Sequence, residues 1–371
     1  MNLHVFLYFF RLHQSSGGAE RMICTLANAL IARGMEVHLV SLDASNETDC
    51  FYSLSPQIRW HRLGNGTTFQ DKIQRTLRLA SLLKREKASA FIGFVMSGDK
   101  TIYAAAKLAR TPIIAAERNG PSIYWLRYSF LQRAISFTLL HLAHRIMVQL
   151  PGYARRYPKS LHKKILAIPN PVSRADTLAQ PNQPGPNGKY TLLTVSRLDS
   201  TQKRLDILIN AFARIADLHP EWQLRIVGDG PEQKKLDLLI RELGVTESVT
   251  LEPAVSDIFS VYQESHLFVL PSLWEGFPNA LAEAMAHGLP AVGFSDAEGV
   301  SDLISHGAGW LAPGSDDVVS LADTLSHAMS DHLARAKNGT IAAERMLNFD
   351  STKIIDQWVS MLDKLSQDQR K

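Results

Sequence analysis

The chain has 371 residues, a length typical of two domains, and its 45% hydrophobic and 20% charged residues exclude a largely disordered protein. Residues 1–172 carry 23 lysines and arginines against 9 acidic residues, a net charge of +14, whereas residues 173–371 carry 17 against 27, a net charge of −10. The basic half favours an anionic partner, either membrane phosphates or nucleic acid; the alternative is a basic domain that complements an acidic neighbour.

Strand-like and helix-like segments alternate through the first half. Expected strands are 3–9, 36–42, 58–63, 90–95, 112–116 and 146–149. Expected helices are GGAERMICTLANALIARG (17–34), 70–87, 99–109 and 123–141. This alternation predicts an α/β domain with a doubly wound parallel sheet.

The apolar start of the chain predicts a strand rather than a signal peptide, because it has no basic lead-in and no small-residue cleavage site. The uncharged run at 134–144 is eleven residues long, too short to span a membrane. We therefore expect a protein that is made and kept in the cytoplasm.

A composition change marks a linker. Residues 173–189 (SRADTLAQPNQPGPNGK) are rich in Pro, Gly, Asn and Gln and have no apolar periodicity, which separates an N-terminal domain at 1–172 from a C-terminal domain at 190–345. Expected strands then lie at 190–195, 223–227, 249–252, 267–270 and 290–294. Expected helices lie at 204–218, 231–243, 278–287, 317–330 and 350–365. The pattern predicts two similar α/β domains with a cleft between them.

Several polar residues follow expected strands, where ligands bind in such sheets. Arg197 follows the strand at 190–195 and Lys203 lies at the start of the next helix, so two cations near a helix N-terminus could hold a diphosphate; the alternative is two solvated loop cations. Gly228, in VGDGP, permits close approach of a ligand or simply makes a tight turn. No GxGxxG with a downstream acid is present, which argues against a nicotinamide dinucleotide.

The densest group of polar residues lies in LPSLWEGFPNALAEAMAHGLP (270–290). Glu275 lies in a turn, and Pro278 is expected at the first helical position. Glu283 lies in an otherwise small, apolar helix and needs a specific partner, because burial of an unpaired carboxylate is costly. Such a carboxylate can accept from vicinal hydroxyls of ribose or a hexose. The alternative is a surface glutamate and a loop glutamate in an acidic domain.

Gly17 and Gly18, in SSGGAE (15–20), join the first strand to the first helix. They permit close backbone approach and leave helix N–H groups for an anion; the alternative is a flexible turn.

Five segments together resemble glycosyltransferase family 4, and the resemblance covers nearly the whole chain. They are GGAERMICTLANAL, AIPNPV, TVSRLDSTQKRLDILINAFARI, LRIVGDGPEQKKL and PSLWEGFPNALAEAMAHGLPAV, in that order. The most specific element is Glu275 and Glu283 with seven residues between them, accompanied by Arg197 and Lys203.

The resemblance implies a GT-B fold, in which two Rossmann-like domains face a cleft and the last helix (346–371) returns to the N-terminal domain. It also implies retaining, metal-independent transfer from a nucleotide-diphospho-sugar, with UDP favoured and no cofactor. The chain agrees in having no Asp-x-Asp, only two cysteines, and no Cys/His cluster with zinc spacing.

Residue roles are carried over from the same resemblance. Arg197 and Lys203 would hold the diphosphate and stabilise it as a leaving group. Glu283 would accept from the ribose hydroxyls. The donor sugar would face a set made of Glu275 and Asn279 with the amides of Gly276 and Phe277, and Gly17 and Gly18 would line the cleft near the diphosphate and acceptor.

Two positions depart from the family pattern. Many relatives have a histidine after the strand expected at 112–116, where this chain has Arg118. We expect Arg118 to contact an acceptor phosphate or hydroxyl in place of a histidine base. Glu252 and Pro253 stand where relatives often have a glycine, so the pocket for the nucleotide base is expected to differ.

Segment 122–147 is both aromatic and basic. It contains Tyr124, Trp125, Arg127, Tyr128, Phe130, Leu131, Arg133 and Phe137. This composition suits an anionic membrane surface or a lipid diphosphate; the alternative is a helix whose aromatics are core. The segment also resembles that of enzymes extending polyprenyl-diphosphate-linked saccharides, which implies that Arg127 and Arg133 contact the acceptor.

We therefore expect a hexosyltransferase, peripheral on the cytoplasmic face of the inner membrane. It would add a hexose or N-acetylhexosamine to a lipid-linked saccharide of a lipopolysaccharide, exopolysaccharide or other glycan. The alternatives are a soluble acceptor, a sugar-nucleotide epimerase, or a nucleic-acid-binding protein. The last is disfavoured because the cations adjoin no nucleic-acid motif and the second domain is acidic.

Overall fold

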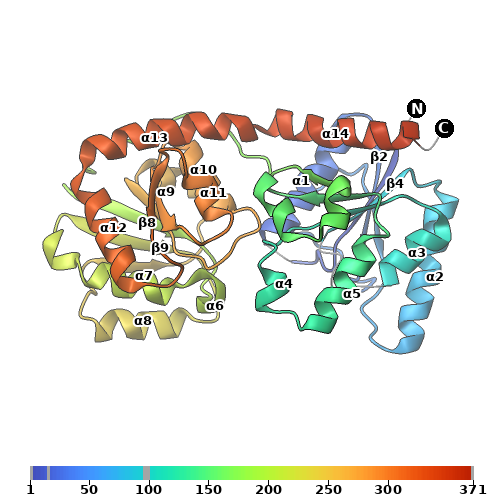
Figure 1. Ribbon diagram of the computed structural model, residues 1–371, viewed down its shortest axis with the longest axis horizontal. Helices are drawn as coiled ribbons and strands as arrows, with labels where there is room; N and C mark the ends of the chain where they lie inside the picture. Colours follow the sequence, from blue (N-terminus) through green and yellow to red (C-terminus); the bar gives the residue numbers. More distant parts are fainter. Residues whose placement is uncertain (1–2, 15–16, 95–100, 369–371) are drawn as a thin grey trace. The chain divides into compact units, whose positions relative to one another are not determined.

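The computed structural model describes residues 3–14, 17–94 and 101–368, which form two compact units. One unit comprises the described parts of Met1–Pro171 and Thr352–Lys371, and the other is Val172–Ser351. The first two residues of the motif at 15–20, the last residue of the expected strand 90–95 and the first two of the expected helix 99–109 lie outside the described residues. Each unit is a parallel sheet flanked by helices (Figure 1).

The described part of the first unit contains a seven-stranded sheet in the order β3-β2-β1-β4-β5-β6-β7, with every pairing between these strands parallel. Its strands are β1 (His4–Tyr8), β2 (Glu36–Ser41), β3 (Arg59–Arg62), β4 (Ala90–Phe94), β5 (Ile113–Ala116), β6 (Arg145–Val148) and β7 (Ile165–Ala167). The central strands β4 and β5 are wholly buried, as expected for a sheet covered on both faces. The six expected strands are confirmed; β7 was not predicted.

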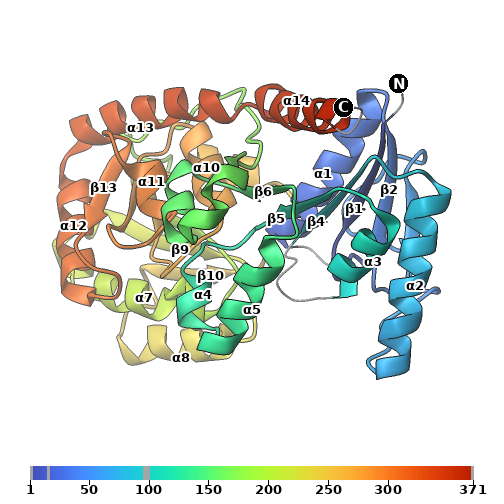
Figure 2. The same cartoon turned by 45° about the vertical axis from the view of Figure 1, so that its right-hand side comes forward.

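Helices cover both faces of this sheet (Figures 1 and 2). They are α1 (Gly18–Ala32), α2 (Phe69–Arg85), α3 (Thr101–Ala109), α4 (Ile123–Leu126), α5 (Phe130–Leu140) and α14 (Ser351–Asp368), with 3-10 turns η1 (Pro151–Arg156) and η2 (Lys159–Lys164). Ile354, Trp358 and Leu362 of α14 join the same apolar core as Val5 of β1 and Leu26 of α1. The expected return of the last helix to the first unit is thus confirmed.

The single helix expected over 123–141 is wrong, because the chain breaks between α4 and α5. Ser129 caps α5: its hydroxyl accepts from the Gln132 amide at 3.3 Å, and the Gln132 side chain accepts from the Ser129 amide at 2.9 Å. This reciprocal capping box starts a new helix, and its Ser-x-x-Gln signature is visible in the sequence.

The described second unit contains a six-stranded parallel sheet in the order β10-β9-β8-β11-β12-β13. Its strands are β8 (Tyr190–Val195), β9 (Trp222–Val227), β10 (Val249–Glu252), β11 (Leu267–Leu270), β12 (Ala291–Phe294) and β13 (Gly309–Ala312). Its helical segments are α6 (Ser200–Lys203), α7 (Leu205–Ala213), η3 (Ala216–Leu218), α8 (Gln233–Glu242), α9 (Ile258–Gln263), α10 (Asn279–Ala286), α11 (Val300–Ile304), α12 (Val318–Ser330), α13 (His332–Met346) and η4 (Leu347–Phe349). Of these, β13, α6, α9, α11, α13 and η4 were not predicted.

Three helix boundaries in this unit correct the expectations. The helix expected at 204–218 is shorter: α7 runs from Leu205 to Ala213 and is followed by η3, while Arg204, with left-handed backbone angles of φ 53° and ψ 39°, separates α7 from α6. Pro231 precedes α8, which begins at Gln233. Pro278 is the N-cap of α10 and not its first helical residue.

Residues of the expected linker pack against the second unit. The Ala179 amide donates to the carbonyl of His287 at 2.8 Å, and buried Arg335 donates from Nε to the carbonyl of Pro181 at 2.9 Å. These hydrogen bonds satisfy main-chain groups of a segment that lacks regular secondary structure and hold it against the unit.

None of the helices within residues 3–14, 17–94 and 101–368 is both long enough and apolar enough to span a membrane.

Candidate functional site

The strand order of the second unit places a ligand-binding position between β8 and β11. The chain runs from β8 to β9 on one side, whereas β11 pairs with β8 on the other side, so the winding of the sheet reverses there. Open α/β sheets bind ligands beyond the carboxyl ends of their strands at such a point. Arg197 follows β8 and Glu275 follows β11, so both predicted residues lie at this edge.

Lys203 and Glu275 form an ion pair at this edge. Lys203 Nζ lies 2.5 Å from Glu275 Oε1, and the two side chains are only 17% and 8% exposed. Two further hydrogen bonds fix the same geometry: the Leu273 amide donates to the Gln202 carbonyl at 2.8 Å, and the side-chain Nε2 of Gln202 donates to the Trp274 carbonyl at 3.0 Å. The loop after β11 is therefore fastened to α6, and the ammonium of Lys203, which has three donors, is held in place beside the strand ends.

Arg197 lies in a different environment. Its side chain is 63% exposed, and its Nη2 donates to Asp199 Oδ2 at 3.3 Å. Asp199 also caps α6 by accepting from the Thr201 amide at 3.0 Å. The structure thus places Arg197 near the start of α6, with Asp199 as its charged partner among the described residues. It does not place Arg197 in contact with Lys203.

Gly228 is required by close packing of the backbone. Its φ is 149°, and a Cβ added there would lie 2.0 Å from the carbonyl oxygen of Ser196. A Cβ at Gly230 would lie 2.4 Å from the carbonyl oxygen of Leu198. Both glycines let the loop after β9 lie directly against the loop after β8, and any residue with a side chain would force the two loops apart.

Glu283 has the specific partner that its apolar helix predicts. The hydroxyl of Tyr262, on α9, donates to Glu283 Oε2 at 3.2 Å. Sequence reasoning missed Tyr262 because α9 has only six residues and gives little periodic signal. The contact orients the half-buried carboxylate of Glu283 on α10.

The turn between Glu275 and α10 contains the remaining residues predicted to bind the donor. The Glu275 amide donates to the Glu298 carbonyl at 3.2 Å. Phe277 is buried and its ring lies 5.7 Å from that of Phe349, so this side chain is core. Gly276 lies within the turn, and Asn279 is the first residue of α10. Only the main-chain atoms of Phe277 can therefore contact a ligand.

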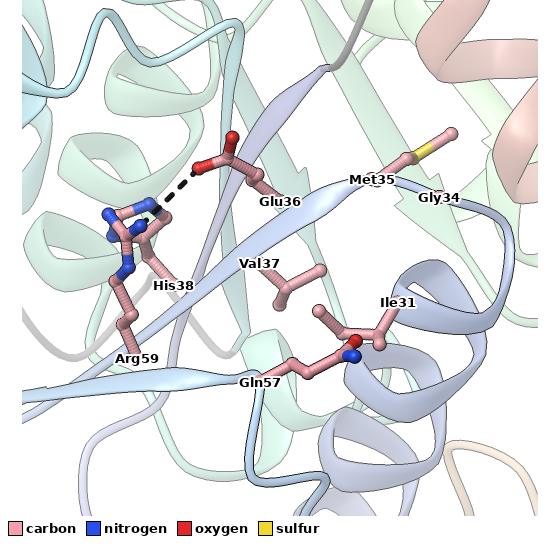
Figure 3. Close-up of a pocket in the computed structure, with 8 residues that line it drawn as sticks. All are labelled: Ile31, Gly34, Met35, Glu36, Val37, His38, Gln57 and Arg59. Atoms are coloured by element: carbon pink, nitrogen blue, oxygen red, sulfur yellow. Dashed lines mark ion pairs between the residues drawn. The ribbon is translucent and has the colours of Figure 1, made fainter.

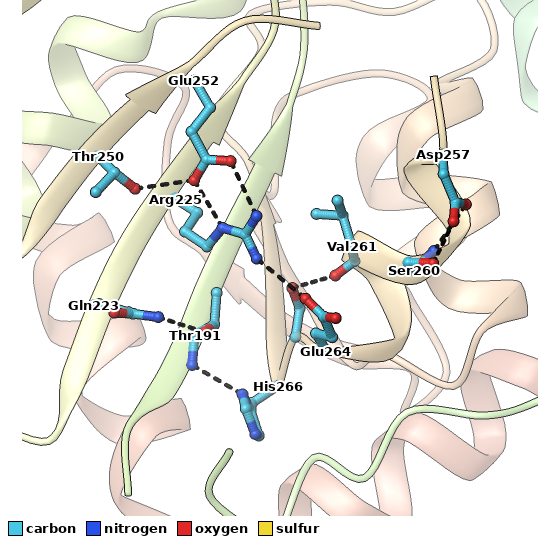
Figure 4. A network of polar contacts seen from close by, with 11 residues as sticks. Thr191, Gln223, Arg225, Thr250, Glu252, Asp257, Ser260, Val261, Glu264 and His266 are labelled. Carbon is cyan, nitrogen blue, oxygen red and sulfur yellow. Dashed lines mark hydrogen bonds and ion pairs between the residues drawn. The ribbon is translucent and has the colours of Figure 1, made fainter. Parts of the chain in front are cut away.

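Glu252 is held by Arg225 in a bidentate ion pair. Arg225 Nε lies 2.8 Å from Oε1 and Nη2 lies 3.0 Å from Oε2, while Glu264 lies 3.7 Å from Nη1 on the other side (Figure 4). Hydrogen bonding to Arg225 lowers the pKa of the Glu252 carboxyl. Glu252, on β10, is therefore bound to the neighbouring strand β9.

In the first unit, Arg118 is a buried cation that follows β5. It is only 6% exposed, its Nη1 donates to Asn170 Oδ1 at 3.1 Å, and its guanidinium lies 4.7 Å from the Phe94 ring and 5.4 Å from the Trp358 ring. Its Nε and Nη2 are buried without a hydrogen-bond partner in the described structure. Burial lowers the pKa of Arg118 to about 9. Two unsatisfied buried donors on a cation favour an anionic ligand.

Glu117, beside Arg118, belongs to a buried cluster of tyrosines. The hydroxyl of Tyr124 donates to Glu117 Oε2 at 2.5 Å, and the hydroxyl of Tyr157 also donates to this carboxyl. Burial raises the pKa of Glu117 despite these hydrogen bonds. The only sequence signal for this group was the Glu-Arg pair at the end of an apolar strand.

Gly17 and Gly18 lie at the start of α1, as predicted. Gly17 is the N-cap with φ −71°, a conformation that any residue adopts, and the Tyr52 hydroxyl donates to its carbonyl at 3.4 Å. A Cβ on Gly17 would meet only the end of the Glu20 side chain. The structure therefore gives Gly17 no backbone reason to be glycine.

The aromatic and basic segment divides into core and surface. Tyr124 is buried, and the ring of half-buried Phe137 lies 4.8 Å from it, so Tyr124 is core and Phe137 packs against it. A surface on α4 and α5, here called the α4–α5 surface, is formed by the exposed residues Trp125, Leu126, Arg127, Phe130 and Leu131 with half-buried Arg133. Arg133 lies 5.5 Å from the Trp125 ring and 5.7 Å from the Phe130 ring, within cation–π range.

Sequence reasoning missed a second apolar stripe in this unit. Phe69, Ile73 and Leu77 are exposed on α2 at spacings of four residues, so they lie on one side of the helix. The signal was present in the sequence as an apolar i, i+4, i+8 pattern beside the stripe that faces the core.

Two family descriptions match the chain. "Glycosyltransferase Family 4" matches residues 16–176, and "Glycosyl transferases group 1" matches residues 176–345.

Individual relatives span almost the whole chain. An uncharacterized glycosyltransferase of Haemophilus influenzae is 28% identical over 94% of this chain and 97% of its own length. The Campylobacter jejuni protein named GalNAc-alpha-(1->4)-GalNAc-alpha-(1->3)-diNAcBac-PP-undecaprenol alpha-1,4-N-acetyl-D-galactosaminyltransferase is 23% identical over 94% of this chain and 95% of its own. The structure of Anabaena HepE with UDP and glucose is similar in fold, with a TM-score of 0.77 over 98% of this chain and 100% of that one at 18% identity.

Proposed function

Because this chain belongs to the GT-B glycosyltransferases, with a family 4 region followed by a group 1 region, we propose that it is a retaining hexosyltransferase acting on a lipid-linked saccharide. The donor is a nucleotide-diphospho-sugar carrying a hexose or N-acetylhexosamine. The observation that carries the proposal is the largely buried Lys203–Glu275 pair at the point where the second sheet reverses its winding.

The second unit binds the donor. Lys203 and Arg197 contact the diphosphate, and Glu283 accepts from the ribose hydroxyls. As the glycosidic bond to phosphate breaks, negative charge grows on the leaving diphosphate, and fixed cations stabilise that charge more than the ground state. In this proposal the two side-chain cations neutralise the charge on the leaving diphosphate, as a divalent ion does in other transferases. Glu275 and Asn279 contact the sugar.

UDP is the first nucleotide to test. Support comes from the fold shared with HepE, which was solved with UDP and glucose. The Arg225–Glu252 pair at the end of β9 and β10 places polar groups near the loop of Gly228, where the nucleotide base is expected. GDP and ADP are therefore tested beside UDP.

The first unit binds the acceptor. The two unsatisfied donor nitrogens of Arg118, Nε and Nη2, match the oxygens of a phosphate, which fits a lipid diphosphate carrier. The name of the Campylobacter relative, with undecaprenol diphosphate in its acceptor, supports the same class of acceptor. Gly17 and Gly18, at the start of α1, lie beyond the carboxyl end of β1 in the same sheet.

A transfer assay tests this proposal. Full-length protein is mixed with radiolabelled UDP-hexoses or UDP-N-acetylhexosamines and either a polyprenyl-diphosphate-linked saccharide or the same saccharide free in solution. We expect label on the lipid-linked acceptor, a loss of at least 100-fold with Arg118→Gln, and no change with Arg241→Gln, an exposed arginine of α8. Transfer to the free saccharide alone would support the soluble-acceptor alternative. Conversion of the donor without any acceptor would support an epimerase.

We further propose that the α4–α5 surface and the α2 stripe bind the cytoplasmic face of the inner membrane. Exposed Phe130 and Leu131 can enter the interface while arginines contact anionic headgroups. Flotation with vesicles containing anionic lipid tests this. Phe130→Ser with Leu131→Ser should abolish flotation, whereas Leu218→Ser, equally exposed in the second unit, should not. Equal flotation of both variants would contradict the assignment.

A further inference from the structure

Three possible metal ligands meet at the amino ends of β1 and β2. His4 and Glu36 are the first residues of the two strands and pair in register, and His38 follows on the same face of the sheet. One ring nitrogen from each histidine and one oxygen of Glu36 lie within 4.8 Å of one another. Two imidazoles and a carboxylate form a set typical of zinc and related divalent ions.

His38 is oriented as a metal ligand requires. The residue is 1% exposed, its Nδ1 lies 2.9 Å from His61 Nε2, and its Nε2 is buried with no hydrogen-bond partner in the described structure. When Nδ1–H donates to His61, the lone pair on Nε2 stays available. Histidines that bind metals commonly donate their other ring N–H in this way, which fixes the tautomer and the ring.

Glu36 divides its two oxygens between the histidine and a cation. Oε1 lies 3.7 Å from His4 Nε2, and Oε2 lies 3.7 Å from Arg59 Nη2. Figure 3 shows the side chains of Glu36, His38 and Arg59 close to one another. These three residues are among those that line a cavity of about 280 Å³. The side chains of His4 and Glu36 are 29% and 37% exposed, so an ion can reach them from solvent. Glu36 Oε2 can stay paired with Arg59 while Glu36 Oε1 binds the ion.

We propose that His4, Glu36 and His38 bind one Zn²⁺ ion, with a water molecule as the fourth ligand. Ligand atoms in a tetrahedral zinc site lie about 3.3 Å apart, so the half-exposed His4 and Glu36 side chains rotate slightly toward His38 on binding. The ion joins the first residues of β1 and β2. Gly17 and Arg118 follow the carboxyl ends of β1 and β5, at the opposite edge of the same sheet, so the ion stabilises the unit and takes no part in sugar transfer. Linear Cys/His spacing does not reveal this set because its members come from two strands.

Zinc titration of the chelator-treated full chain tests the site. Calorimetry with ZnCl2 should give one ion per chain, saturating zinc should raise the melting temperature, and Co²⁺ should give the visible absorption of a tetrahedral site. His4→Asn with Glu36→Gln should weaken zinc binding at least 100-fold and remove the rise in melting temperature. Glu36→Gln alone should act in the same direction, and His38 is left intact because it is core.

Two control variants separate this site from other zinc ligands. His332→Asn removes an exposed histidine of the second unit, and Cys50→Ser removes the thiol that lies 3.7 Å from Cys24 Sγ. Both should bind zinc as the wild type does. The proposal is overturned if the wild type binds no stoichiometric zinc, if the His4 and Glu36 substitutions leave binding unchanged, or if Cys50→Ser abolishes it.

Discussion

Replacing Lys203 with alanine should destabilise the second unit strongly, because Glu275 then loses its counter-ion while remaining 8% exposed. Removing one partner of a buried ion pair typically costs about 3–5 kcal/mol, whereas an exposed pair contributes about 0–1 kcal/mol. The 2.5 Å contact and the low exposure of both side chains place this pair in the first class. The double variant Lys203→Met with Glu275→Gln removes both charges and should recover most of the loss.

Native-state hydrogen exchange measures this effect within the second unit. Amides of β8 and β11 should lose protection by two to three orders of magnitude in Lys203→Ala and by far less in the double variant. Amides of β1 and β4, in the first unit, serve as the internal control. A loss below about tenfold in Lys203→Ala would refute the reasoning, because the pair would then behave as one screened by solvent.

Three further predictions concern stability. Gly228→Ala should lower the free energy of unfolding by at least about 3 kcal/mol, because its Cβ would lie 2.0 Å from a carbonyl oxygen. Gly244→Ala, with φ 71° and open space around it, should lower it by about 1 kcal/mol. Thermal melting compares the two variants, and equal losses of stability would contradict the packing argument. Trp358→Ala should cost about 3–5 kcal/mol because it removes a fully buried ring that packs α14 onto the rest of the first unit. Exposed Gln357→Ala should cost almost nothing, and urea denaturation compares the two variants. Because the folded-state pKa of Glu252 is lowered, its contribution to stability is present above the ordinary pKa of 4.5 and is lost as the pH falls below that value. Glu252→Gln should therefore flatten the acid side of a plot of melting temperature against pH. Glu264→Gln, whose side chain is 69% exposed, should leave that plot unchanged.

The two parallel sheets followed from local sequence patterns. Short apolar runs that alternate with amphipathic helices leave few alternatives to a doubly wound sheet. Where a break depended on tertiary contacts, the sequence was less informative. Arg204 adopts a left-handed conformation that its residue type does not indicate, and it separates α7 from the unpredicted helix α6.

Helix α13 shows why one element was missed. Gly339 in its middle and its many polar residues argue against a helix locally. In the structure a Cβ at Gly339 would lie 2.2 Å from the carbonyl oxygen of Gly288, just after α10. The glycine that weakens the helix on its own is therefore what lets it pack closely, and no local pattern carries that information.

The candidate site, too, was only partly predictable from local sequence patterns. Residue types and spacing singled out Lys203, Glu275 and Glu283, but the contacts between distant segments had to come from the fold. Lys203 pairs with a residue 72 positions away, and Glu283 pairs with Tyr262 on an unpredicted helix. For Arg118, sequence indicated a cation at a strand end, and only the fold revealed that it is buried with two unsatisfied donors.

Calorimetric titration with nucleoside diphosphates is the most direct test of the central claim that the second unit binds the donor through these residues. Wild type is compared with Arg197→Gln combined with Glu283→Gln, which leaves the buried Lys203–Glu275 pair intact, and with Arg241→Gln on exposed α8 as the matched control. The account predicts saturable binding of UDP, weakened at least 100-fold in the double variant and unchanged in the control. If UDP, GDP and ADP all fail to bind, or if the double variant binds as the wild type does, the assignment of the donor site is wrong.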